Sequence, residues 1–416
     1  MLLRKFSITA IVALLFVPLV SQDAQAATFT TQEINEIHNF QKEYASLDKT
    51  NYSASNIYAV KPHLSKKFKA GRLRSKYINT QIDYINYYRS LFGLSPVTTS
   101  DSSNSDAQKT AAVMAAINAN PFINQHGLPS EKRPSFISKA TWKLAKETSE
   151  SSNLNFNVSR QSAGEVITDL VTDHYNLSGT DTGHRAWLLS TRLTTTGIGA
   201  AYGNNGYRYS VQKVLNANDM FRASSQPVVT YPSVRLFPSE LAQGKNIVWS
   251  IYLSNRVVRT TPTITIRDLD TDIVTNGTHV RNYSSGGYGN FKTIITYSPG
   301  KTVIISGHEY EININGVYKY RFKLFKQDAT NDTTIYATQE EQQANQTNQT
   351  NQTNTSLDRQ TEVQSPILLQ NKILNAAIDA KTVSLPTNSN NLFDQLTKKG
   401  KWKQNFFVKT IRLQKH

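Results

Sequence analysis

The sequence predicts a mixed α/β domain followed by an all-β immunoglobulin-like sandwich, a disordered linker and a small basic C-terminal segment. Three observations predict this order. Apolar residues recur at helical spacing in residues 71–223, short β-branched and aromatic segments fill residues 224–327, and polar residues dominate 328–370. The length of 416 residues exceeds one ordinary core and favours several domains.

Composition narrows the class of protein. The chain has 46 Lys and Arg against 30 Asp and Glu, a net charge of +16, and no cysteine. Disulfides, thiolate metal sites and cysteine nucleophiles are therefore excluded. Hydrophobic residues make up 38% of the chain, which is sufficient for packed cores, so we expect a folded protein.

Residues 1–26 have the pattern of a secretory signal peptide. Arg4 and Lys5 precede an apolar run at 8–20, and residues 24–26 supply small side chains for cleavage. The run is shorter than the roughly 20 residues that span a bilayer, and an uncleaved anchor is the alternative. No later apolar run is long enough, so we expect a mature chain without a transmembrane segment. Secretion without disulfides fits a Gram-positive bacterium.

Residues 27–70 form a polar region with room for one or two helices. A cluster of cations extends from it into the next region, with six Lys or Arg and no acid at 66–76. The cluster is either the solvated face of a helix or a patch that binds a polyanion. These cations are Lys66, Lys67, Lys69, Arg72, Arg74 and Lys76.

Four helices and a terminal hairpin are expected within residues 71–223. Gly93 ends the first helix, Ser105 or Asp106 caps the second, and residues 203–206 form the turn of the hairpin. The helices are predicted over 78–94, 106–119, 136–148 and 163–174. The hairpin strands are predicted over 194–202 and 207–215.

Residues 224–327 are predicted to form the β-sandwich, because turns with Gly, Asn or Pro separate their short strand-like segments. The expected strands are 247–253, 262–266, 293–297, 302–305, 310–314 and 318–325.

The polar stretch 328–370 contains a Gln-Thr-Asn tract with little to bury, and it is predicted to be a disordered linker. The segment 371–416 carries nine Lys or Arg against two Asp, and at 398–407 it interleaves cations with aromatic rings. It could bind anionic cell-wall polymers or lipid headgroups, or it could be a solvated tail. A secreted protein is not expected to have nucleic acid as its partner.

Three segments hold residues that can carry chemistry. His126 follows the second predicted helix, Glu165 opens the fourth helix, and Asp173 ends it. A Gly-His-Arg motif at 183–185 then supplies His184.

This set of motifs resembles the CAP superfamily, the SCP-like domain of cysteine-rich secretory, venom-allergen and pathogenesis-related proteins. Asn-Tyr-Tyr-Arg at 86–89 and Gly-Leu-Ser-Pro-Val at 93–97 resemble the family's first helix and its exit. Gly-His-Arg at 183–185 resembles the bacterial His motif, and Gly-Ile-Gly at 197–199 the strand after it. Ala-Gly-Glu at 163–165 occupies the place of the Gly-Glu-Asn signature. The resemblance covers about a third of the chain and implies a CAP-type α-β-α sandwich.

In that family two His and two acids converge in a central cavity. Carried over residue by residue, they are His126, Glu165, Asp173 and His184. The match departs from the family at Asp173, where Glu is usual, and at Val166, where the signature has Asn. His126 and Glu165 are also 39 residues apart, farther than in the compact members.

Such a tetrad allows three interpretations. His126 and His184 could ligate a divalent metal such as zinc, with the acids orienting the ring protons. The groups could act as general acid and base, or they could form a buried polar network that fixes the packing. The chain has no Gly-x-Ser-x-Gly elbow and no His-Glu-x-x-His helix. Four other His lack a partner at ligand spacing: His38, His63, His279 and His308.

Three functional hypotheses follow. The first is a secreted, non-enzymatic CAP-type protein, non-covalently associated with the cell wall, that binds a small ligand or a surface polymer through its cavity and its basic regions. The second is a metal-dependent or His/acid hydrolase that uses the tetrad. The third is an adhesion or interaction protein that acts through the β-sandwich.

Overall fold

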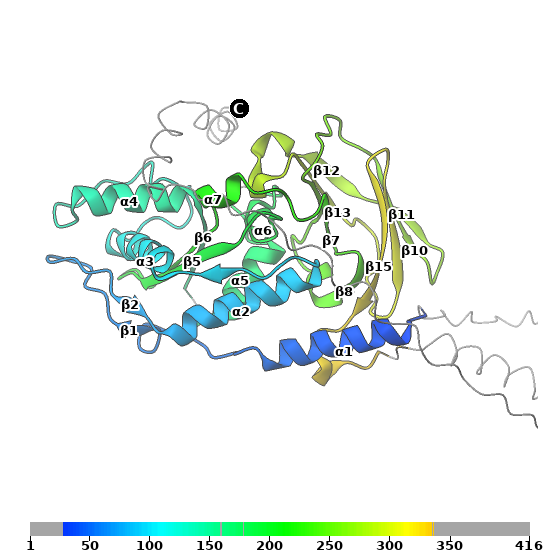
Figure 1. Ribbon diagram of the computed structural model, residues 1–416, viewed down its shortest axis with the longest axis horizontal. Coiled ribbons are helices and arrows are strands. Elements are labelled where there is room, and N and C mark those ends of the chain that lie inside the picture. Colours follow the sequence, from blue (N-terminus) through cyan, green and yellow to red (C-terminus); the bar gives the residue numbers. More distant parts are fainter. Residues whose placement is uncertain (1–27, 159, 178, 335, 337–416) are drawn as a thin grey trace, which may run out of the picture.

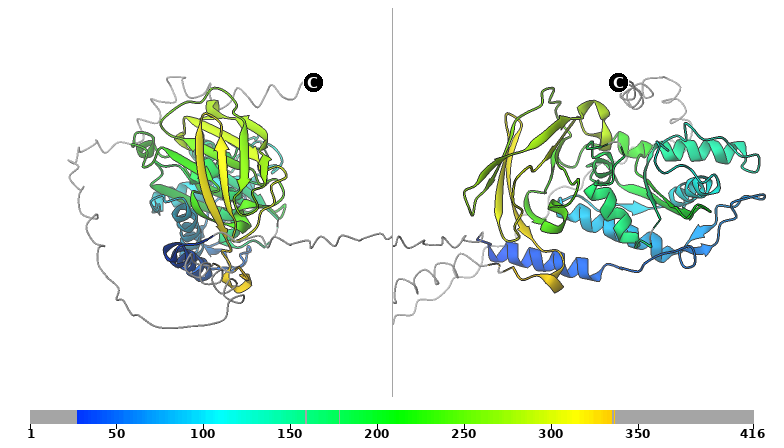
Figure 2. Two further views of the ribbon diagram at one scale, coloured as in Figure 1. Left: turned by 90° about the vertical axis from the view of Figure 1, so that its right-hand side faces the viewer. Right: turned by 180° about the vertical axis from the view of Figure 1, so that it is seen from behind.

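Figure 1 shows the computed structural model, which describes residues 28–158, 160–177, 179–334 and 336. The predicted signal peptide, most of the predicted linker and the basic segment 371–416 lie outside the described residues. The described part consists of a helix-rich region and a sheet-rich region that lie side by side (Figures 1 and 2). No helix in it is both long and apolar enough to cross a bilayer.

A four-stranded sheet in the order β3-β5-β6-β4 forms the middle of the helix-rich region. Helices α3 and α4 cover one face of it, where Tyr209 and Val211 join their core. Helices α2 and α5 lie on the other face, where Ile198 and Ala200 point. The strands are β3 Thr98–Thr99, β4 Ser152–Asn157, β5 Thr195–Tyr202 and β6 Arg208–Lys213. The helices are α2 Ser75–Leu91, α3 Asp101–Ala116, α4 Lys139–Glu150, α5 Ala163–Thr172, α6 Gly183–Leu188 and α7 Ala217–Met220.

Two glycines of β5 allow helix α3 to lie directly on the sheet. A Cβ atom at Gly199 would lie 2.2 Å from the backbone of Ala107, and one at Gly197 would lie 2.4 Å from the carbonyl oxygen of Ser103. Any side chain there would force helix and strand apart. The Gly-Ile-Gly motif thus serves close backbone packing.

The four predicted helices and the hairpin are present, with shifted ends. Helix α2 ends before Gly93, which has a φ of 64° as expected for a C-terminal stop. The predicted cap of α3 is wrong, because the helix begins five residues earlier and the Ser100 side chain accepts the N–H of Ser103. The sequence did not predict β4 or α6.

The cation cluster 66–76 is not the face of one helix. It lies mainly on the loop between β1, Tyr58–Val60, and β2, Arg72–Leu73, two short strands that pair with each other. All six of its cations are exposed.

Two further sheets make up the sheet-rich region, in the orders β12-β13-β9-β7 and β11-β10-β14-β15-β8. Aromatic rings join them, since the ring centroids of Trp249 and Phe322 are 5.5 Å apart. The first sheet has β7 Val228–Tyr231, β9 Trp249–Leu253, β12 Thr278–Asn282 and β13 Thr293–Ser298. The second has β8 Arg235–Pro238, β10 Ile264–Asp268, β11 Val274–Asn276, β14 Glu309–Ile314 and β15 Tyr318–Phe325. A short helix, α8 Ser239–Ala242, follows β8.

The strand predicted over 302–305 is wrong. This segment is a loop after the turn at Pro299 and Gly300, and its apolar side chains are partly in solvent, with Val303 68% exposed. Strands β7, β8, β11 and β12 were not predicted. They are three to five residues long, which leaves little room for an alternating pattern.

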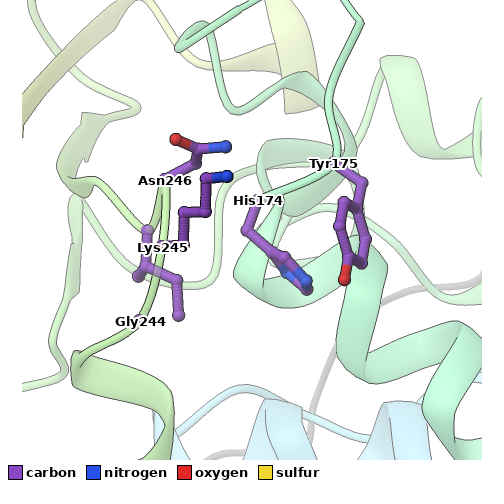
Figure 3. A pocket seen from close by; sticks show the side chains of 6 residues that line it. His174, Tyr175, Gly244, Lys245 and Asn246 are labelled. Atoms are coloured by element: carbon purple, nitrogen blue, oxygen red, sulfur yellow. The ribbon is translucent and has the colours of Figure 1, made fainter.

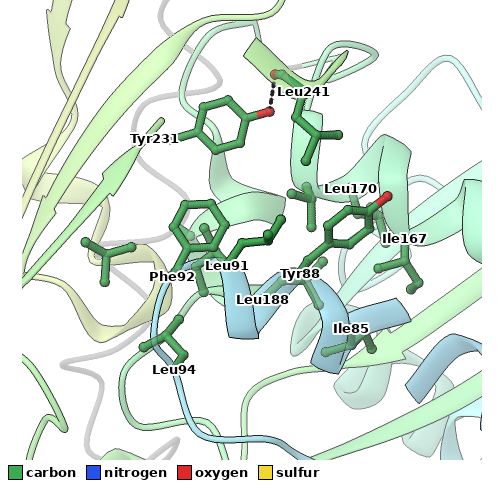
Figure 4. Close-up of a cluster of buried hydrophobic side chains, with 14 of the residues drawn as sticks. Ile85, Tyr88, Leu91, Phe92, Leu94, Ile167, Leu170, Leu188, Tyr231 and Leu241 are labelled. Atoms are coloured by element: carbon green, nitrogen blue, oxygen red, sulfur yellow. Dashed lines mark hydrogen bonds between the residues drawn. The ribbon is translucent and has the colours of Figure 1, made fainter. Parts of the chain in front are cut away.

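One continuous hydrophobic core joins the two regions. Figure 4 shows Tyr88 of α2 and Phe92, which follows that helix, in one cluster with Tyr231 of β7 and Leu241 of α8. The rings of Phe92 and Tyr231 stack with centroids 6.0 Å apart, and the Tyr231 hydroxyl donates to the Leu241 carbonyl. The predicted α/β and β domains therefore share a buried interface.

The N-terminal polar region also packs on this body. Helix α1, Thr31–Ser46, lies against the end of β15, where the rings of Phe40 and Phe325 stack. The Gln41 amide donates to the Lys326 carbonyl and to Asp332. This helix precedes the α/β region in the chain but is anchored to the β region.

Candidate functional site

His184 and Asp173 form a hydrogen-bonded pair in which the acid is buried and the imidazole is partly exposed. Nδ1 of His184 lies 2.8 Å from Oδ1 of Asp173, whose side chain is 1% exposed. Asp173 caps the C-terminus of α5 in a left-handed conformation, with a φ of 56°. Its Oδ2 accepts the Arg185 backbone N–H at 3.1 Å, so the carboxylate is fixed from two sides. Because a carboxylate accepts, Nδ1 of His184 carries the proton and Nε2 keeps a lone pair when the ring is neutral.

His126 is held in a similar way by a backbone group. Its Nδ1 lies 2.9 Å from the carbonyl oxygen of Ser149, at the end of α4. A carbonyl can only accept, so Nδ1 is the protonated nitrogen and Nε2 again keeps its lone pair. The neighbouring Gly127 N–H donates to the Ser149 hydroxyl, which holds the loop against α4.

The environments of the two rings shift their pKa values in opposite directions. Burial lowers the pKa of His126 to about 4, and the charge of His184 adds to this effect. Burial also acts to lower the pKa of His184, but the Asp173 carboxylate, with a smaller effect of Asp181, outweighs it, so this pKa is raised. His126 is therefore the neutral ring of the two, and His184 is the ring that is more easily protonated.

The Glu165 carboxylate bonds to neither of the two histidines. Its Oε2 accepts the backbone N–H of Ser162 at 2.6 Å, and its own N–H donates to the Ser162 hydroxyl. This is a capping box at the start of α5, and Glu165 is exposed there. Of the four candidate residues, the structure pairs Asp173 with His184, places His126 close enough to feel the charge of His184, and gives Glu165 a helix-capping contact.

Side chains that sequence reasoning missed support the His184 loop. The Asp181 carboxylate accepts the Gly183 N–H at 3.1 Å, and burial raises the pKa of Asp181. Thr182 shares a 2.8 Å hydrogen bond with the hydroxyl of Tyr252 in β9. The Asp181 contact could have been predicted, because an Asp two residues before Gly183 is a local turn signal. The contact with Tyr252 could not, because Tyr252 belongs to the β region, far away in the sequence.

Arg185 connects the same loop to the β region. The side chain is fully buried, and its guanidinium carbon lies 3.6 Å from the centre of the Tyr231 ring. Its N–H groups donate to four acceptors. They are the carbonyl oxygens of Val171, Thr172 and Val248 and the hydroxyl of Ser250. Two of these acceptors end α5 and two belong to the β region, so one side chain joins them.

A separate groove lies nearby, between the loop after α5 and the loop before β9. Figure 3 shows His174 and Tyr175 on one side of it and Gly244, Lys245 and Asn246 on the other. It does not include His126 or His184. His174 instead lies with Nδ1 2.6 Å from the Thr172 hydroxyl.

The arrangement sets limits on its chemistry. Two imidazoles with fixed Nδ1 atoms can offer two Nε2 ligands to a divalent metal, with Asp173 orienting one of them. Within the described residues, the three-ligand group that comes together lies elsewhere, at Asp268, Asp270 and His308. A metal between His126 and His184 would therefore take its other ligands from solvent or from a bound molecule.

The helix-rich region has helices on both faces of a four-stranded sheet, and its His184–Asp173 pair joins α6 to the end of α5. Residues 82–214 match the family CAP, described as Cysteine-rich secretory protein family. This stretch of the chain is therefore a CAP domain. Among curated proteins, none matches the chain.

Proposed function

We propose that this chain is a secreted, non-enzymatic CAP-type protein, with a β-sandwich after its α-β-α domain, that binds a ligand through His126 and His184. The observation that carries the proposal is the matched fixing of both rings. Each Nδ1 atom meets an acceptor within 2.9 Å, which leaves each Nε2 available. A divalent metal such as zinc is the simplest ligand for two such nitrogens.

Zinc titration of the full chain tests this proposal. The wild type is expected to bind zinc, and His126→Ala and His184→Ala should each abolish binding at this site, because one imidazole alone is a weak ligand. His174→Ala is the matched control and should bind like the wild type. Equal binding by the wild type and the double variant His126→Ala/His184→Ala would refute the proposal.

A His/acid hydrolase is the second candidate, and the opposed pKa shifts support it. A ring whose pKa is about 4 is a neutral base at pH 7, and a ring with a raised pKa can hold a proton to donate. Peptide, ester and glycan substrates would reveal this activity. Turnover that disappears in His126→Gln and His184→Gln would replace the binding proposal with catalysis.

The exposed cations 66–76, here called the basic ribbon, support surface retention. Phe68 packs on the core under α3, and the Gln108 amide donates to the Ala70 carbonyl, so the ribbon is anchored while its cations face solvent. Among the described residues, Lys76 pairs with Asp48, and the other five cations form no ion pair. We propose that the basic ribbon binds a phosphate-bearing polymer or headgroup.

Binding to a polyglycerol phosphate and to anionic vesicles distinguishes the two phosphate sources. Reversal of three ribbon cations to Glu (Lys66, Lys67 and Lys69) should weaken binding and reduce its dependence on salt. Reversal of three exposed cations elsewhere (Arg259, Lys292 and Lys301) is the control. If both triple variants lose affinity equally, net charge explains the binding and the ribbon does not.

Adhesion through the β-sandwich remains a third proposal, but deletion of residues 224–327 is a poor test of it. The deletion would expose the core that Phe92 shares with Tyr231 and remove two acceptors of Arg185. Substitution of exposed sandwich residues tests it without unfolding the CAP domain.

A further inference from the structure

The β region contains a cluster of metal-ligating side chains that is far from the His126 and His184 pair in the chain. Asp268 ends β10, Asp270 lies in the turn toward β11, and His308 directly precedes β14. One ligand atom of each lies within 4.8 Å of the other two. The antiparallel pairing of β10 with β14 brings these residues together across 40 positions of sequence.

Hydrogen bonds fix the three side chains in place. Asp268 Oδ2 lies 2.9 Å from Nδ1 of His308, while its Oδ1 accepts the backbone N–H of Asp270 at 3.0 Å. Oδ2 of Asp270 accepts the Glu309 N–H at 2.7 Å, and the Leu269 N–H donates to the Glu309 carbonyl. Both carboxylates are thus aimed by the backbone, so little side-chain entropy would be lost on binding a ligand.

The electrostatics of the cluster call for a cation. Asp268 and His308 are each 6% exposed, and Asp270 is half-buried. Within the described part of the chain, neither Asp268 nor Asp270 pairs with a Lys or Arg. One buried and one half-buried carboxylate therefore lie beside a single imidazole, without a Lys or Arg partner, in a chain that is otherwise strongly basic.

We propose that Asp268, Asp270 and His308 form a divalent metal site, with zinc as the favoured ion. Two carboxylate oxygens and one imidazole nitrogen suit zinc or manganese, whereas calcium and magnesium prefer oxygen ligands alone. Three protein ligands leave at least one position for water.

The bound ion would have a mechanical effect on the sandwich. The turn after β10 and the start of β14 are joined at present by hydrogen bonds among Asp268, Asp270, His308 and Glu309. A metal shared by both segments would add a crosslink at that end of the sheet. Zinc should therefore raise the melting temperature of the folded chain, because a ligand that binds the native state alone stabilises it.

The experiment uses the full chain with His126→Ala and His184→Ala, so that the site proposed above contributes nothing. After treatment with a chelator, this background is expected to bind one zinc ion by native mass spectrometry and calorimetry. Adding Asp270→Asn should weaken zinc binding by more than about 10-fold, and adding His308→Gln should abolish it. Calcium should not compete.

Asp272→Asn is the matched control. Asp272 lies in the same turn, but it is exposed and pairs with Arg267. Asp270→Asn keeps the test valid if His308→Gln does not fold, since an Asn oxygen can still accept the Glu309 N–H. An absence of zinc binding in the background chain, or equal affinity of Asp270→Asn and Asp272→Asn, would overturn the proposal. If the Asp268, Asp270 and His308 site binds zinc but the His126 and His184 site does not, the wild-type chain should bind one zinc ion rather than two.

Discussion

Replacement of Arg185 by Met tests how strongly the β region is joined to the loop that carries His184. Methionine keeps most of the length and apolar character of the side chain but removes the guanidinium. Four hydrogen bonds and the contact with the Tyr231 ring are lost together. Their acceptors remain buried, so water does not readily replace the lost donors.

The expected magnitude follows from these contacts. Hydrogen bonds to a charged group contribute about 1.5–3 kcal/mol each, and a desolvated cation–π contact contributes about 2 kcal/mol. Burying the guanidinium costs several kcal/mol in the wild type, which offsets much of that sum. Removing one partner of a buried charged network typically costs about 3–5 kcal/mol. We therefore expect Arg185→Met to lower the free energy of unfolding by about 4 kcal/mol.

Urea unfolding followed by tryptophan fluorescence measures this loss. Trp187 in α6 and Trp249 in β9 lie on the two sides of the Arg185 contacts, and both are buried. Arg259→Met, at an exposed position, is the matched control and should change stability by less than about 0.5 kcal/mol. A loss below about 1 kcal/mol in Arg185→Met would show that the guanidinium does not hold the two regions together.

Three further predictions concern the sheet and the His pair. Gly199→Ala should destabilise the chain by more than about 2 kcal/mol in a thermal melt, because its Cβ would meet the α3 backbone at 2.2 Å. Gly183→Ala is the control and should cost less than about 1 kcal/mol, because the nearest atom to its Cβ lies 3.6 Å away. In an NMR titration, His126 should protonate near pH 4 and His184 above pH 6.5. The stability that neutral His126 contributes is complete above pH 6.5 and is lost as the pH falls toward 4. The stability that protonated His184 contributes is present below pH 6.5 and is lost as the pH rises through the pKa of His184 in the folded state. Asp173→Asn should lower the pKa of His184 and leave that of His126 close to 4, and an unchanged His184 titration would exclude the carboxylate as the cause.

The sequence predicted those parts of the fold that have local signals. Helix α2 follows its apolar spacing and ends before Gly93, and the β5–β6 hairpin follows its Gly-Asn-Asn-Gly turn. Strand β4 has no comparable signal, because Asn153 and Asn155 alternate with Leu154 and Phe156 and all four lie inside the α/β region or at its edge. A polar strand face can be recognised as buried only when the helices that cover it are known.

The residues of the candidate site could likewise be predicted only where a local sequence signal exists. The Gly-His-Arg motif identified His184, but the role of Glu165 depended on which of two local signals was given priority. Ser162-Ala163-Gly164-Glu165 also fits the capping-box pattern, and the structure shows that contact. His308 had no partner in its own segment, because Asp268 reaches it through strand register rather than through local spacing.

The contacts around α6 join the CAP domain to the β region. A Cβ atom at Gly289 would lie 2.1 Å from the Ala186 carbonyl, so the turn before β13 touches the backbone of the helix that presents His184. Thr182, which precedes α6, and Arg185 of α6 bond to strand β9. A ligand that shifts α6 would therefore disturb these contacts with the β region as well. The effect of a ligand should accordingly be measured on both regions, and variants of the sandwich-facing contacts should alter the pKa of His184 without touching its ring.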